Sequence, residues 1–314
     1  MKPRALASWL VAGVLFMAPH VAHACGACRG PVGPGATLTA PWQRMAAVLV
    51  QNTRTSFGRW VGDSYRGLSP AERESGSDWL AGVAIRPTPK LEFAAYSGLG
   101  TATFAASGFY DKTRSATDTV LRVRWDAIAE PALDVLGQTP SLGLGLGLRL
   151  PTGSVGHGAI GEKGGGGAVL GASPTGTSLG TTEIAAAADV RKTWNKVQLA
   201  GILEGALRIP DRVLGPTRML GPRVLGRAVF MWFASERWTA SVFADFGWEG
   251  PLVFDGRTVR DSAARSLAIG ASTVFKFDNG FRAGVGTSVA PPIDALGNDV
   301  PAFVQLSTFV GFAR

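Results

Sequence analysis

Two cysteines and three histidines limit the chemistry that this chain of 314 residues can perform. Cys25 and Cys28 form a C-x-x-C pair, a spacing typical of a short disulfide, a redox centre or a soft-metal site. Arg29 stands where c-type haem attachment requires a histidine, no βαβ pattern follows the pair, and two thiolates are too few for a metal site. We therefore interpret the pair as a disulfide or as an unpaired structural element.

One histidine, His157, lies beyond the first 24 residues. The sequence Gly156-His157-Gly158-Ala159-Ile160-Gly161 matches the G-x-G-x-x-G pattern of dinucleotide-binding loops, but the helix that such a loop requires does not follow. A Ser-His catalytic site needs a supported histidine base, and a histidine-based metal site needs several ligands. The sequence therefore predicts no cofactor, no metal site and no enzymatic activity.

The first 24 residues are organised like a secretory signal peptide. Lys2 and Arg4 precede an apolar run over residues 5–18, and Ala22-His23-Ala24 is an A-x-A cleavage site. The run is shorter than the roughly 20 residues of a transmembrane helix. We therefore predict export and cleavage before Cys25.

Cleavage would make Cys25 the first residue of the mature chain, which leaves lipidation as an alternative to pairing with Cys28. Ala22 stands where a lipidation signal usually has leucine, so the disulfide is preferred. The net charge of +8 and the pI of about 10.0 would fit a nucleic-acid partner, but export excludes one. We predict three parts: a signal peptide (1–24), a periplasmic arm rich in Gly and Pro (25–45), and a folded domain (46–314).

The folded domain repeats segments of about ten residues in which apolar and small or polar residues alternate. In the clearest one, leucines at positions 142, 144, 146, 148 and 150 alternate with Gly143, Gly145, Gly147 and Arg149. Such alternation is the period of a strand with two unlike faces. A soluble β-sandwich would expose a charged face, whereas here the continuous apolar face carries almost no charge. The pattern predicts an all-β fold, a transmembrane antiparallel up-and-down β-barrel.

About twelve such segments are predicted, and the connections between them alternate between short and long. An even number of strands places both chain ends on the periplasmic side. Seven aromatic residues lie near the predicted periplasmic strand ends, where a belt at the headgroup level is expected: Trp194, Trp232, Trp238, Phe275, Phe277, Phe281 and Phe312. The predicted segments are 46–56, 77–86, 91–101, 115–127, 140–150, 181–192, 198–208, 222–233, 238–248, 264–276, 281–290 and 302–312.

The polar face of the strands should line the lumen. Its charged side chains are candidates either for a constriction that selects solutes or for a plug of mutually paired ions. Because cations outnumber anions, an open pore would favour anions. The candidates are Glu92, Arg122, Arg124, Asp126, Arg149, Glu183, Asp189, Arg191, Glu204, Arg208, Arg227, Asp245, Lys276 and Arg282.

The sequence from Gly143 to Gly153, a Leu-Gly strand that runs into Leu-Pro-Thr-Gly and then a long Gly-rich loop (152–180), resembles the porin-like outer-membrane proteins related to the phenol-degradation MetA-pathway family. This resemblance implies a transport role for small, including apolar, compounds. The expected function is an outer-membrane channel or facilitator, and the alternative is a structural or binding barrel with a plugged lumen. Expected partners are outer-membrane lipid, lipopolysaccharide, the barrel-assembly machinery and a small solute, and the sequence leaves the oligomeric state open.

Overall fold

The computed structural model describes most of the predicted folded domain. The described residues are 43–70, 72–106, 109–128, 139–154, 178–212, 217–259, 262–298 and 300–314. The predicted signal peptide, the Cys25–Cys28 pair, His157 and most of the 152–180 loop lie outside them. Among the described residues, no helix is long and apolar enough to cross a membrane.

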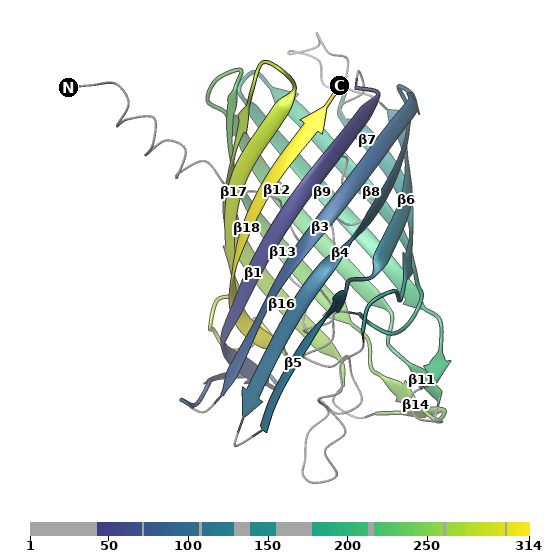
Figure 1. Ribbon diagram of the computed structural model, residues 1–314, viewed down its shortest axis with the longest axis vertical. Helices are drawn as coiled ribbons and strands as arrows, with labels where there is room; N and C mark the ends of the chain where they lie inside the picture. Colours follow the sequence, from purple (N-terminus) through teal and green to yellow (C-terminus); the bar gives the residue numbers. More distant parts are fainter. Residues whose placement is uncertain are drawn as a thin grey trace, which may run out of the picture.

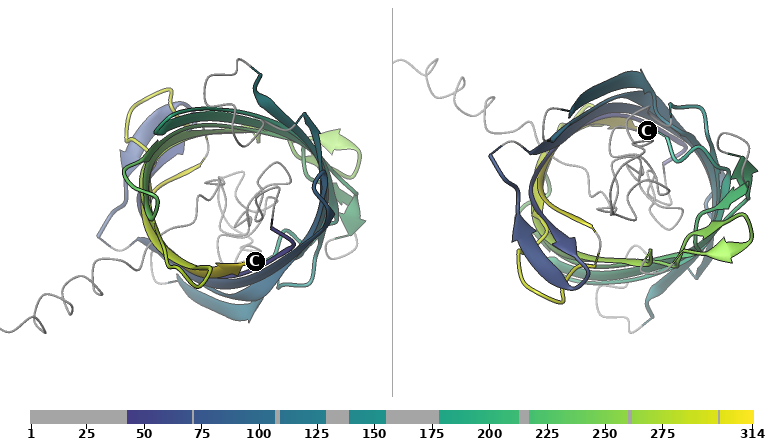
Figure 2. Two further views of the ribbon diagram at one scale, coloured as in Figure 1. Left: turned by 90° about the horizontal axis from the view of Figure 1, so that it is seen from above. Right: turned by 90° about the horizontal axis from the view of Figure 1, so that it is seen from below.

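Twelve antiparallel strands form one closed up-and-down barrel (Figures 1 and 2), as the alternation predicts. Each strand pairs with its neighbours in chain order, and the first and last strands close the wall. The wall strands are β1 (Met45–Val61), β3 (Arg73–Thr88), β4 (Leu91–Ala106), β6 (Thr119–Ile128), β7 (Ser141–Leu150), β8 (Glu183–Trp194), β9 (Val197–Arg208), β12 (Arg223–Phe233), β13 (Trp238–Glu249), β16 (Ala264–Lys276), β17 (Phe281–Val289) and β18 (Pro301–Ala313).

The two ends of the barrel differ. Short turns join β3 to β4, β8 to β9, β12 to β13 and β16 to β17 at the end where β1 begins and β18 finishes, which we call the turn end. The opposite end, the loop end, carries the longer connections. In the β8–β9 turn Asn195 has a φ of 48°, a left-handed conformation that asparagine tolerates better than most residues. Both chain ends of the barrel therefore lie at one end, as an even strand count requires.

The fourth predicted segment, 115–127, is not one strand. It comprises the end of β5 (Phe109–Ala116) and most of β6, which pair with different parts of β4. Between them the Thr117 carbonyl accepts a hydrogen bond from the Thr152 hydroxyl (2.8 Å), and the Asp118 carboxylate accepts one from the Leu179 amide (3.1 Å). The Thr117 amide still donates to the Gly98 carbonyl of β4 at 2.9 Å, but these two bonds tie residues 117 and 118 to the β7–β8 connection, and the strand is interrupted here.

The long connections hold further short strands that the segment pattern does not show. β2 (Ser64–Gly67) folds back on β1, so that β1 is longer than the predicted 46–56. β10 (Asp211–Arg212), β11 (Thr217–Met219), β14 (Val253–Phe254) and β15 (Arg257–Thr258) form a separate four-stranded sheet beside the loop end (Figure 1). These pieces are too short for periodicity to reveal them.

At the loop end, an apolar cluster stabilises the closure of the barrel, where the first strand β1 pairs with the last strand β18. Trp60 of β1 is 2% exposed and packs with Phe303 of β18 and Val300 in one apolar cluster. Its indole nitrogen donates a hydrogen bond to the Ile293 carbonyl (2.9 Å), and a Cβ at Gly297 would overlap the indole ring. The β17–β18 connection therefore wraps around Trp60 and holds the first strand to the last.

The outer face of the barrel is apolar, as predicted. Leu146, Leu203 and Val242 are 59%, 60% and 54% exposed, and each is more exposed than its two strand neighbours on the other face. Trp194, Trp232, Trp238, Phe277 and Phe281 are exposed at or beside the turn-end termini of their strands. Phe275 and Phe312 are half-buried at the same end. The predicted aromatic belt is therefore present on this side of the barrel.

Candidate functional site: the charged lumen

The inner face of β7 is a strip of glycines between two charged strands. Gly143 lies between Asp126 of β6 and Asp189 of β8 in the ladder, and a Cβ at Gly143 would overlap the side-chain ends of Arg124 and Asp189. Because these glycines have no side chains, long side chains from β6 and β8 can meet over the β7 backbone. In the Leu-Gly alternation of β7, the leucines therefore form the apolar outer face, and the glycines leave room for charged side chains on the inner face.

Arg124 is the centre of the first group of charges. Its Nε and Nη2 donate to the two carboxylate oxygens of Asp189 at 2.9 and 3.0 Å, and its Nη1 donates to Asp126. Arg191 lies 3.2 Å from Asp189 and 3.6 Å from Asp126. Arg124 is 1% exposed, so this bidentate pair is shielded from solvent and is stronger than a surface ion pair.

Glu92 extends this group towards β3. Its carboxylate accepts a hydrogen bond from Arg122 at 3.0 Å and one from Arg86 at 3.3 Å. Arg86 also donates to Asp126 at 2.5 Å, which links both carboxylates. The Arg122 guanidinium stacks over the ring of Tyr96, 5.1 Å from its centroid. Arg122 and Arg124 lie two residues apart, and their like charges are compensated by carboxylates on β4 and β8.

A second group surrounds Glu183 at the loop-end side of β8. Arg208 and Arg223 donate to its two oxygens at 3.1 and 2.6 Å, and Arg149 lies 3.7 Å away. Arg223 also donates to Glu204 at 2.7 Å. In a separate bond, Arg208 reaches Glu249 of β13 at 2.5 Å. Every charge in this group has an opposite partner on a nearby strand.

Two smaller groups continue around the wall. Arg227 of β12 donates to both carboxylate oxygens of Asp245 at 2.5 and 2.6 Å and stacks on Phe243, with its guanidinium 5.1 Å from the ring centroid. On β1, Arg54 lies 3.8 Å from Glu74 and 5.5 Å from the ring centroid of Phe303. Arginine therefore combines ion pairing with aromatic stacking in both groups.

Most of the predicted lumen charges face inwards. Lys276 is exposed at the end of β16, so it belongs to the rim rather than to the lumen. Arg282 is half-buried at the turn end and donates to Gln43 at 3.0 Å. The remaining candidates occupy the four groups described above or neighbour them.

Several inward charges were not among the candidates. Arg86 lies two residues after the inward Ala84 on β3, and Arg223 lies four residues before the inward Arg227 on β12. Because every second residue of a strand faces the same side, alternation alone could have identified both. Glu249 lies one residue beyond the predicted segment. Arg54 and Glu74 were hidden because the first segment mixes polar and apolar residues on one face and the second begins later than β3.

A row of short side chains crosses the wall from β13 to β1. One continuous row of cross-strand partners runs Ser241, Ser272, Gly286, Ser307 and Asn52 across β13, β16, β17, β18 and β1. All five face inwards, as their burial relative to their strand neighbours shows. Beside the paired arginines and carboxylates, the lumen therefore carries a row of hydroxyl, amide and glycine groups. Val50, Arg54, Phe243 and Phe309 face inwards two residues along the strands from this row.

The charges in the groups from β3 to β13 almost balance. There are eight arginines and seven carboxylates, which leaves one net positive charge. The arginines are at positions 86, 122, 124, 149, 191, 208, 223 and 227, and the carboxylates at 92, 126, 183, 189, 204, 245 and 249. Among the described residues, no group of three or more His, Cys, Asp and Glu side chains could hold a metal ion.

No protein-family model and no curated protein sequence matches this chain. Solved structures with the same architecture do. The COG4313 outer membrane channel from Pseudomonas putida F1 aligns with a TM-score of 0.68 at 11% identity, over 91% of this chain and 99% of that one. A mutant of the TodX monoaromatic hydrocarbon channel aligns with a TM-score of 0.49 at 10% identity, over 97% and 98% of the two chains. The predicted fold is therefore confirmed, and this chain is a twelve-stranded antiparallel barrel with the architecture of outer-membrane channels.

Proposed function

We propose that this chain is an outer-membrane channel or facilitator for small solutes. One observation carries the proposal: the inward charges from β3 to β13 are paired with one another, while a continuous row of short polar groups crosses β13, β16, β17, β18 and β1. Paired charges need no counter-ion from the lumen, and hydroxyl and amide groups can replace the hydration of a passing solute. A path for solutes from one end of the barrel to the other would then pass the row from Ser241 to Asn52.

The orientation of the barrel in the outer membrane and a transport role without catalysis belong to the same proposal. The signal peptide directs export, and the turn end with both chain ends faces the periplasm, as in bacterial barrels with an even strand number. The likeness in fold to the COG4313 outer membrane channel supports a transport role. The resemblance noted at Gly143–Gly153 supports small, including apolar, solutes as cargo.

Conductance of the purified barrel in planar bilayers tests the proposal. The wild-type barrel should give discrete single-channel steps, and Ser307→Trp should reduce the step size because an indole would project into the lumen from the row of short side chains. Leu306→Trp is the matched control, because its side chain is exposed on the outer face of the same strand. A wild-type barrel without steps at any voltage, or equal conductance in both variants, would reject a path past this row.

The alternative is a structural or binding barrel with a closed lumen. Its specific support is that the inward charges are almost completely buried: Glu92 is 0%, Arg124 1% and Asp245 2% exposed. A plug of this kind would give no conductance steps, yet it would lose stability when one arginine is removed. The bilayer recording and a thermal melt together separate the two functions.

A further inference from the structure

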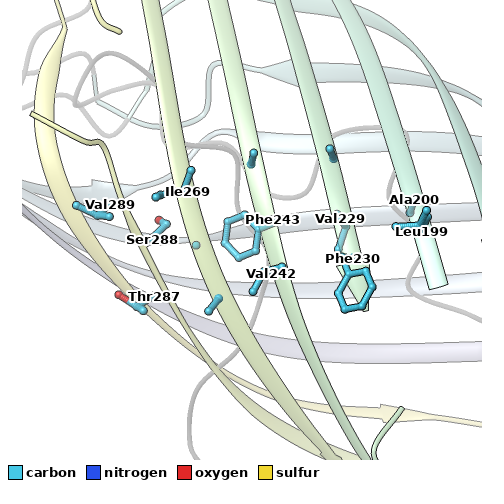
Figure 3. Close-up of a pocket in the computed structure, with 14 residues that line it drawn as sticks. Leu199, Ala200, Val229, Phe230, Val242, Phe243, Ile269, Thr287, Ser288 and Val289 are labelled. Carbon is cyan, nitrogen blue, oxygen red and sulfur yellow. The ribbon is translucent and has the colours of Figure 1, made fainter. Parts of the chain in front are cut away.

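An apolar groove of about 830 Å³ crosses the barrel wall over β9, β12, β13, β16 and β17 (Figure 3). Leu199, Phe230, Val242 and Ile269 border it and are 47%, 42%, 54% and 47% exposed, so these side chains point away from the lumen. Ala228 and Ala244 are paired in the ladder between these larger residues. Nine of the fourteen lining residues have outward positions on their strands, and the other five, which include Phe243, alternate with them. Because the exposed lining side chains point outwards, we interpret the groove as a hollow in the membrane-facing surface, where methyl groups lie between bulky side chains.

The depth of the groove follows from the strand register. Leu199 and Val242 are the ladder partners of Phe230, and Trp232 lies two residues further towards the turn end on the same face. Tryptophan rings on the outer face of a barrel mark the headgroup level. Two residues of strand span about 7 Å. The groove therefore begins just below the headgroups, at the depth of the lipid hydrocarbon.

A positive charge lies at the same end of this surface. Lys196 is exposed in the β8–β9 turn, three residues before Leu199. In the adjacent β12–β13 turn, Arg237 is paired with Asp278 at 2.7 Å, and Glu236 adds one acidic group. Lys192, the ladder partner of Leu199, is buried and donates to the Thr139 carbonyl at 3.4 Å, so Lys196 is the exposed cation beside the Leu199 end of the groove.

We propose that the groove holds one acyl chain of an anionic phospholipid whose phosphate binds Lys196. The groove supplies walls on both sides of the chain, so an acyl chain seated there gains contacts that it lacks on a smooth wall. From the turn end towards the middle of the barrel, Lys196 comes first, then Trp232 and then the groove. A lipid presents its phosphate, its interfacial region and its hydrocarbon in the same order. A second copy of the barrel is the competing occupant, and the experiments below distinguish it from a lipid.

Native mass spectrometry with added phosphatidylglycerol tests this site. Replacing both floor alanines with Ala228→Phe and Ala244→Phe fills the groove and should weaken lipid retention about tenfold, the equivalent of roughly two buried methylene groups. The matched control is Ala186→Phe with Ala188→Phe, two exposed alanines on the outer face of β8. Heat-modifiable gel mobility confirms that each variant is folded.

The headgroup contact has its own variant. Lys196→Glu should weaken retention of phosphatidylglycerol and leave retention of phosphatidylcholine unchanged. Equal lipid retention in the groove variant and the β8 control would overturn the acyl-chain site. A wild-type dimer that the groove variant dissociates would assign the groove to a second copy of the chain instead, and would overturn the proposal as well.

Discussion

Arg124 on β6 and Asp189 on β8 form a two-bond ion pair across the intervening strand β7, directly over Gly143. Neither residue lies on a strand adjacent to the other, so the pair exists only because β7 presents no side chain at that point. The glycine is thus as necessary to the pair as its two charges.

Gly143→Val should separate this pair and destabilise the barrel by about 2–3 kcal/mol, because it leaves buried charges poorly compensated. Gly205→Val is the control, since a Cβ at Gly205 meets nothing within 4 Å. Urea unfolding in detergent micelles measures both. Similar unfolding midpoints for the two variants would show that Arg124 and Asp189 do not meet over β7.

Removing one member of the pair should cost more than removing both. Arg124→Leu leaves Asp189 and Asp126 with less compensation and should cost about 3–5 kcal/mol, while Arg124→Leu with Asp189→Leu should recover part of this loss. Thermal melts of Arg124→Leu, Asp189→Leu and the double variant, compared with the wild type, form a double-mutant cycle. Strict additivity would contradict a direct interaction.

Depth in the membrane should determine the cost of a charge on the outer face of β9. Leu203, in the middle of the strand, and Leu207, near its loop end, are 60% and 69% exposed. Leu203→Arg should cost about 2–4 kcal/mol and Leu207→Arg about 0–1 kcal/mol. Refolding yields into lipid vesicles distinguish them, and a larger loss for Leu207→Arg would mean that the apolar band is placed wrongly along the barrel.

Trp60→Ala should open the loop end at the seam between β1 and β18. Losing a fully buried tryptophan from an apolar cluster costs about 3–5 kcal/mol, and here it also leaves the Ile293 carbonyl without its indole donor. Trp194→Ala, a half-exposed tryptophan at the other end, is the comparison. Protease cleavage within the β17–β18 connection should increase in Trp60→Ala alone, and unchanged cleavage would count against this role for Trp60.

Alternation predicted the wall strands except the interrupted segment 115–127, and with the short and long connections it predicted the closed barrel, because a wall between lipid and lumen imposes a period of two on every strand. It could not predict which charges meet. Asp189 reaches Arg124 across another strand, and that contact depends on the register of three strands at once. The break at Thr117 and Asp118 escaped prediction for a similar reason, since its hydrogen bonds come from the distant β7–β8 connection.

The register of the ion pairs has a consequence for the order of assembly. Arg149 and Glu183 lie opposite each other on β7 and β8, Glu183 and Arg208 on β8 and β9, and Arg227 and Asp245 on β12 and β13. Other pairs, such as Arg124 with Asp189 and Arg208 with Glu249, join strands that are two apart in the wall. Each charge therefore meets a partner once the next one or two strands are in place, before β18 meets β1. Insertion of such a polar lumen can thus proceed in the order of the chain. The arginines from β3 to β13 gain their carboxylate partners before the last strand is inserted.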